Sequence, residues 1–169
     1  MAIQTSYEGS NDDFENSGTT GYTAQGFKVP SNCSCNSISI SGSRGSGSSG
    51  TFAMEIYSGA APDSTLVQTE TFNSTVLSAY DANPHWDEVV FTTPVNLVAG
   101  TQYYARFRSV TGSATDELRW STDTTSPSYA DGTSWVFTAA VWTQQSTRCK
   151  NFRVNGTVSN SSSGFLAFF

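Results

Sequence analysis

His85 is the only histidine in this chain of 169 residues, so histidine-dependent catalysis would have to use it. The carboxyl groups of Asp81, Asp87 and Glu88 are close to it in sequence and are candidates for a glycosidase pair. A turn that leads into a strand with solvated carboxylates explains the same residues. No nucleophile elbow, phosphate loop or metalloprotease motif accompanies them. We therefore expect no enzymatic activity, with a sandwich hydrolase as the alternative.

The three cysteines allow at most one disulfide within the chain. If Ile38 and Ile40 face a core, strict alternation turns Cys35 outward, and Cys149 has the same parity in its own strand. A bridge from Cys35 to Cys149, or from Cys33 to Cys149, is then geometrically conceivable, and three free thiols are the alternative. A zinc site fits poorly, because C-x-C with one distant cysteine is not a usual ligand spacing.

Asp116, Asp123 and Asp131 occur in turn-rich segments, where carboxylates and carbonyls could hold a structural calcium ion. Aspartate also forms turns without any metal, by accepting hydrogen bonds from nearby backbone N–H groups. We expect no cofactor, with structural calcium as the alternative.

Aromatic side chains can stack on sugar rings while arginine and amide side chains bind the hydroxyls. Core packing is the competing explanation, above all for Trp120 and Trp135. The candidate glycan contacts fall into a first set, Trp86, Tyr104, Arg106 and Arg108, and a second set, Trp120, Tyr129, Trp135 and Trp142.

The clearest strand pattern covers residues 86–109, where two alternating runs flank a turn at Ala99-Gly100. The pattern predicts a hairpin with one buried face and one solvated face. In such a hairpin Glu88 would face Arg106 or Arg108 across the two strands. The side chains expected to face the core are Val89, Phe91, Val95, Leu97, Tyr103, Ala105 and Phe107.

Further strand-length runs recur along the chain, and no helical periodicity persists. The pattern predicts an all-β fold, an antiparallel two-sheet β-sandwich of roughly eight or nine strands in a single domain. Residues 1–20 are expected to form an N-terminal arm, residues 21–158 the sandwich, and residues 159–169 a Ser-rich linker with an apolar tail. The runs are residues 3–7, 22–30, 34–41, 51–57, 65–72, 118–122, 135–142 and 151–158.

The composition, with 13% charged and 13% aromatic residues and a net charge of −6, is typical of a turn-rich all-β protein. The few basic residues are scattered, so we expect no nucleic-acid partner. No window is apolar enough to span a membrane, and the first residues do not resemble a secretory leader. We expect neither a membrane-spanning segment nor export through a leader.

Several segments together resemble a known family of modules. They are AQGFKVP (24–30), FAMEIYSGAAPDSTLVQT (52–69), WDEVVFTTPVNLVAGTQYYARF (86–107), LRWSTDTTSPSYADGTSWVF (118–137) and FRVNGTV (152–158). In this order they resemble the jelly-roll sandwich modules, related in shape to carbohydrate-binding modules, that recur in phage virion and tail-fibre proteins and in bacterial surface proteins. The resemblance covers about residues 22–158 and implies a jelly roll with a binding or structural role.

The C-terminal pentapeptide FLAFF is apolar and needs cover, from a neighbouring subunit or from its own sandwich. The expected assembly contacts are Phe165, Leu166, Phe168 and Phe169. We expect a non-enzymatic virion structural protein, a phage head-decoration or tail-associated subunit that forms homo-oligomers and docks on other virion subunits. It would be made in the host cytoplasm and lie on the virion surface. The alternative is an extracellular carbohydrate-binding adhesin module.

Overall fold

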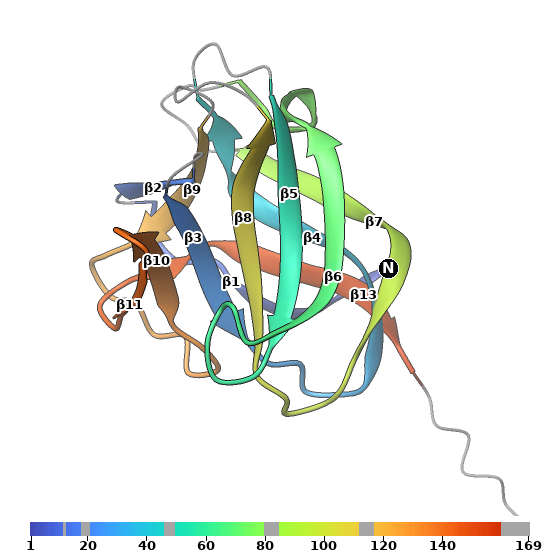
Figure 1. Ribbon diagram of the computed structural model, residues 1–169. Coiled ribbons are helices and arrows are strands. Elements are labelled where there is room, and N and C mark those ends of the chain that lie inside the picture. The colour runs from blue at the N-terminus through green and yellow to red at the C-terminus, as the bar shows by residue number, and fades with distance from the viewer. Residues whose placement is uncertain (12, 18–20, 46–49, 80–84, 112–116, 160–169) are drawn as a thin grey trace, which may run out of the picture.

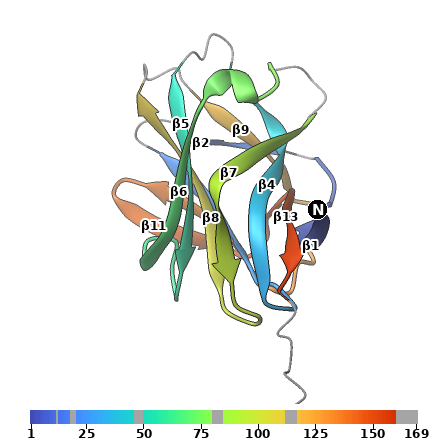
Figure 2. The same ribbon diagram turned by 90° about the vertical axis from the view of Figure 1, so that its right-hand side faces the viewer.

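Alternating apolar residues build two antiparallel β-sheets that face each other across one core (Figures 1 and 2). The computed structural model describes residues 1–169 except 12, 18–20, 46–49, 80–84, 112–116 and 160–169. The predicted all-β, two-sheet sandwich is confirmed. The only helix in the described residues is a short 3₁₀ turn, η1 (Ser74–Val76). No helix within them is long and apolar enough to cross a membrane.

The seven-stranded sheet lies behind the six-stranded sheet in the view of Figure 1. Its strand order is β1 (Ala2–Tyr7), β13 (Phe152–Val158), β4 (Cys33–Arg44), β9 (Leu118–Asp123), β12 (Cys149–Lys150), and in addition β2 (Asp13–Ser17) pairs with β9 and β7 (His85–Leu97) with β4. The order in the six-stranded sheet is β11 (Val141–Gln145), β10 (Ser134–Thr138), β3 (Tyr22–Phe27), β8 (Tyr103–Thr111), β5 (Thr51–Ser58), β6 (Thr65–Asn73).

Aromatic rings from both sheets meet in the core. Phe107 of β8 packs edge-on against Trp120 of β9, with 5.0 Å between ring centroids, and Phe27 of β3 contacts Phe152 of β13. Trp120 is fully buried, and its indole N–H donates to the Asn151 carbonyl at 2.7 Å. Burial of rings of this size is the main favourable contribution to such a core.

The hairpin predicted for residues 86–109 is right about the faces and wrong about the pairing. All seven side chains expected to point inward belong to the core. The two strands do not pair with each other, however, because β7 pairs with β4 while β8 pairs with β3 and β5. The turn at Gly100 carries the chain from one sheet to the other, and a φ of +72° suits glycine there.

The single strand expected at residues 135–142 is in fact a hairpin, β10–β11. It turns at Ala139 and Ala140, whose φ angles of 50° and 64° are in the left-handed region. Two-residue hairpin turns favour this conformation but normally use Asn or Gly for it. The turn therefore left no recognisable signal in the sequence.

A β-bulge in β4 changes which of its side chains face the core. Against β13 the register shifts here, because the consecutive residues Asn155 and Gly156 pair with Ser37 and Cys35, so one extra residue of β4, Asn36, interrupts the alternation. Ile38 and Ile40 face the core as expected, but Cys35 faces it too and is 1% exposed. The outward parity predicted for Cys35 is wrong for this reason.

The N-terminal residues expected to form an arm contribute two strands to the seven-stranded sheet. β1 runs antiparallel to β13, with Ala2 opposite Gly156, and β2 pairs with β9. Between these strands, Asn151 holds the backbone of the arm, since its Oδ1 accepts from Gly9 N at 2.7 Å and its Nδ2 donates to the Ser10 carbonyl at 3.1 Å. The arm is therefore part of the folded domain.

Candidate functional site

The outer face of the six-stranded sheet has a charged cluster at its centre. β8 alternates between core side chains and the outward-facing Arg106 and Arg108. Both guanidinium groups converge on Glu55 of the neighbouring strand β5. Arg106 Nε donates to Glu55 Oε2 at 2.7 Å and Arg108 Nε to Oε1 at 2.9 Å. The Glu55 side chain is only 4% exposed, so this ion pair is shielded from water.

Arg106 is enclosed by aromatic rings. Its guanidinium carbon lies 4.4 Å from the centroid of the Tyr57 ring, 5.8 Å from that of Tyr22 and 6.0 Å from that of Trp142. It also donates to the Tyr57 hydroxyl at 2.5 Å. Burial, together with the nearby Glu55 charge, raises the pKa of Tyr57 even though Arg106 opposes the change. Arg106 thus anchors the rings around it.

Three partly exposed rings form a row beside this cluster: Tyr22 of β3, Phe137 of β10 and Trp142 of β11. Register places them directly opposite one another, with Phe137 across from both Tyr22 and Trp142. Each neighbouring pair has its ring centroids 5.2 Å apart. We call these three residues the aromatic row.

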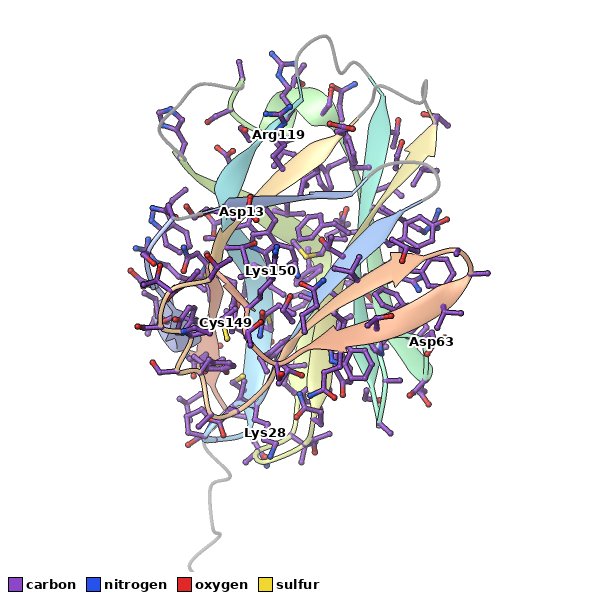
Figure 3. The ribbon with its side chains drawn as sticks, turned by 90° about the vertical axis from the view of Figure 1, so that its left-hand side faces the viewer. Asp13, Lys28, Asp63, Arg119, Cys149 and Lys150 are labelled. Carbon is purple, nitrogen blue, oxygen red and sulfur yellow. The ribbon has the colours of Figure 1, made fainter. Side chains whose placement is uncertain are left out.

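The β10–β11 hairpin places Trp142 close to the charged cluster. The centroid of its ring lies 6.0 Å from the Arg106 guanidinium carbon, so these two long side chains span the distance between β11 and β8. Figures 2 and 3 show the hairpin projecting from the body of the sandwich on this side.

A fully buried lysine holds the base of the hairpin. Figure 3 shows Lys150 next to Cys149 on β12. Lys150 Nζ donates to the Ser134 hydroxyl, lies 3.5 Å from the Trp135 carbonyl and is 5.9 Å from the Trp120 ring centroid. Because Ser134 and Trp135 begin β10, this contact ties the hairpin to the opposite sheet.

One end of the face is covered by protein. The Tyr104 hydroxyl donates to the Ala60 carbonyl at 3.0 Å, and its ring meets Trp135 edge-on. Tyr104 is 5% exposed as a result, and burial raises its pKa. The accessible part of the face is therefore the part around the aromatic row and Arg108.

The structure brings only some of the predicted glycan contacts together. Tyr104, Arg106, Arg108, Trp135 and Trp142 share the face described above.

The other predicted glycan contacts lie elsewhere. Trp86 belongs to the opposite sheet, where it pairs with Ser41. The guanidinium carbon of Arg153 lies 3.8 Å from the centroid of the Trp86 ring. Trp120 is in the core, which its alternative reading anticipated, and Tyr129 packs on Phe152. Neither predicted set of glycan contacts therefore forms a single site.

The charge pair expected between Glu88 and Arg106 or Arg108 is absent, because these residues lie on different sheets. Glu88 instead accepts hydrogen bonds from Ser37 and Asn155. Asp87 points to the other side of β7 and accepts from Ser78 N at 2.8 Å. Adjacent strand residues face opposite ways, so these two carboxylates do not form a glycosidase pair.

His85 is exposed at the start of β7. Asp81, the third predicted carboxylate near it, lies outside the described residues.

The three cysteines are free thiols in the structure, so neither candidate disulfide with Cys149 is formed. All three are buried. Burial, with the neighbouring Cys33, raises the pKa of Cys35 to about 12, and burial also raises the pKa of Cys33 and Cys149. They behave as small core side chains rather than reactive groups.

Asp123 is a turn-forming residue, and both of its carboxylate oxygens accept hydrogen bonds from the protein. Its Oδ2 accepts from the Tyr7 hydroxyl at 2.5 Å and its Oδ1 from Ser10 Oγ at 2.9 Å, and the Thr125 and Ser126 N–H groups complete the set. Burial alone would raise the pKa of Asp123, but these donors outweigh it and hold the pKa far below its ordinary value.

Of the other two calcium candidates, Asp131 is exposed and Asp116 lies outside the described residues. No group of metal-binding side chains gathers among the residues that the structure covers.

The sequence-based prediction missed four residues of the face: Tyr22, Glu55, Tyr57 and Phe137. Glu55 and Tyr57 left a usable signal, because they alternate with the apolar Met54 and Ile56, which face the core, and must then point outward. Tyr22 and Phe137 left none, because their proximity depends on the pairing of β3 with β10.

The predicted assembly contacts Phe165, Leu166, Phe168 and Phe169 are outside the described residues.

Comparison with models of known protein families and with curated proteins gives no match to this chain. The resemblance to jelly-roll modules therefore has only the strand pattern and the two-sheet fold as support.

Proposed function

We propose that this protein is a non-enzymatic carbohydrate-binding module of the jelly-roll kind, with the outer face of the six-stranded sheet as its ligand face. The aromatic row is the observation that carries the proposal. Sugar rings present flat C–H faces, which stack on partly exposed aromatic rings, while nearby charged groups bind hydroxyls. Tyr22, Phe137 and Trp142 offer such rings side by side on one sheet face, with Arg108 on the same face.

The design of the face favours binding over a purely structural role. The cluster of Arg106, Glu55 and Tyr57 fixes the positions of the rings before any ligand arrives. A site prepared in this way loses little conformational entropy on binding. Residues that served only to fill a core would face the opposite sheet, as Phe107 and Trp120 do.

Binding to an array of neutral and acidic glycans tests the proposal with a matched pair of variants. Trp142→Ala removes one ring of the row, and Trp86→Ala removes an equally large, 38% exposed ring from the opposite sheet. We expect Trp142→Ala to weaken binding about tenfold or more, and Trp86→Ala to bind like the parent protein. The absence of any bound glycan, or equal binding by Trp142→Ala, would contradict the proposal.

A role as a virion subunit that docks on its neighbours is a second proposal, and β6 favours it. This strand is the outer edge of the six-stranded sheet, and it exposes Leu66 and Val67 by 51% and 38%. Exposed edge strands are ready sites for pairing with another chain. Removal of residues 160–169 should reduce the assembly size measured by light scattering, and an unchanged size would count against the predicted tail contacts.

A further inference from the structure

The charged cluster on the proposed ligand face has an excess positive charge. Two guanidinium groups, of Arg106 and Arg108, share the single carboxylate of Glu55, and each oxygen of that carboxylate accepts from a different arginine. Glu55 can neutralise only one of them. The centre of the face is therefore positive on a protein whose net charge is −6.

The two arginines differ in their access to solvent. The Arg106 side chain is 13% exposed, lies among rings and already donates to Tyr57. The Arg108 side chain is 34% exposed, and its one hydrogen bond within the described part of the chain uses Nε. The two terminal amino groups of Arg108 are thus available for a ligand, while Glu55 holds the guanidinium by its other end.

We infer that the face binds a sugar that carries a carboxylate, and that Arg108 binds this carboxylate through its terminal amino groups. The inference rests on the proposed function. A guanidinium is a planar fork that matches the two oxygens of a carboxylate, and such paired, charge-assisted hydrogen bonds are roughly twice as strong as neutral ones.

Arg108 is placed to act together with the aromatic row. β3 and β8 pair Thr23 with Phe107, and the same register continued by one residue brings Tyr22 beside Arg108. Tyr22 in turn stacks on Phe137 with 5.2 Å between centroids. A uronic or sialic acid residue could rest its ring on the aromatic row and direct its carboxylate to Arg108.

The overall negative charge strengthens the case for a local contact. An acidic protein repels anionic polymers in general, so any attraction must come from the cluster itself. A neutral glycan needs only hydroxyl acceptors and aromatic surface, and it would leave the excess charge of the cluster without a partner.

The test compares acidic polysaccharides with forms in which each carboxylate has been reduced to a primary alcohol. Polygalacturonate, alginate and hyaluronan are suitable probes, because reduction keeps the sugar rings and removes only the charge. By affinity electrophoresis or calorimetry, we expect at least one native polymer to bind about tenfold or more tightly than its reduced form. Arg108→Gln should lose that preference, and so should Arg108→Lys, which keeps the charge without the fork.

Arg153→Gln is the matched control, since Arg153 is an equally charged, 29% exposed arginine on the opposite sheet. It should bind like the parent protein, and thermal melting of each variant confirms that it is folded. Equal binding of native and reduced polymers, binding of a sulfated galactan alone, or unchanged binding by Arg108→Gln would overturn the carboxylate inference and leave the proposed function standing. Failure to bind any polymer, neutral or acidic, would overturn both.

Discussion

Arg106 donates to Glu55 from the neighbouring strand at 2.7 Å, and both side chains are largely shielded from water in the middle of an outer sheet face. Outer faces of sandwiches are normally solvated, so a shielded ion pair there needs cover. Tyr22, Tyr57 and Trp142 provide it. The pair and its rings thus form a small second core outside the main one.

Removal of Glu55 should destabilise the fold. Glu55→Ala would leave Arg106 and Arg108 without their shared partner, and loss of one member of a shielded ion pair costs about 3 kcal/mol. Unfolding by guanidinium chloride should show this loss as a lower free energy of unfolding. Glu70→Ala is the control, because Glu70 contacts Thr92 in an exposed position and its loss should cost less than about 1 kcal/mol. Equal losses in the two variants would contradict the second-core description.

Asp123 should make stability depend on acid pH. Its pKa is lowered in the folded state, so its contribution is complete above the ordinary pKa of about 4 and is lost as pH falls through the lower folded value. Asp123→Asn should therefore be less stable than the parent by about 2 kcal/mol or more at pH 7. The difference should shrink between about pH 4 and pH 2. Chemical denaturation at several pH values measures it, and a difference that stays constant with pH would refute the assignment.

The three thiols should be unreactive in the native protein. Burial, with Cys33 beside it, raises the pKa of Cys35 to about 12, and Cys33 and Cys149 are buried as well. Iodoacetamide at pH 8 should label none of them in the time that labels a free peptide thiol, and all three after unfolding. Intact mass without reductant should match three free thiols. A mass lower by two hydrogen atoms would reveal a disulfide instead.

Asn151 should be the main attachment of the N-terminal arm. Its side chain bonds to Gly9, Ser10 and Asn11. Asn151→Ala should cost on the order of 3 kcal/mol, because several backbone groups lose their partner at once. Hydrogen exchange should also become faster in residues 2–11 than in β5. Thr157→Ala, at an exposed position of β13, should change neither measurement.

Alternation along the sequence predicted which side chains face the core, and it did so well. Val89 and Phe91 in β7 and Tyr103, Ala105 and Phe107 in β8 all face the core as expected. The rule works there because a two-residue period depends only on local strand geometry. It could not predict which strands are neighbours, so Glu88 was expected to face Arg106 although the two are on different sheets. The bulge at Asn36 defeated even the local rule, since one extra residue in β4 inverts every side chain that precedes it in the strand.

The sequence predicted the outward-facing residues of β8 in the candidate site, but not the residues that other strands contribute to it. Outward parity identified Arg106, Arg108 and Tyr104 correctly, because they follow one another on β8. Trp142 is near Arg106 only because a hairpin with an alanine turn pairs with β3 and so joins the same sheet. Contacts of this kind depend on long-range pairing, and the sequence alone does not encode them in any local pattern.

The pairing of Ala2 with Gly156 has a practical consequence for display of the protein. The beginning of β1 and the end of β13 are neighbours on the sheet that carries no aromatic row. A short peptide could therefore join them into a closed ring, or the whole domain could be inserted into a surface loop of a carrier protein. After insertion, the sheet face that carries the aromatic row would point away from the point of attachment.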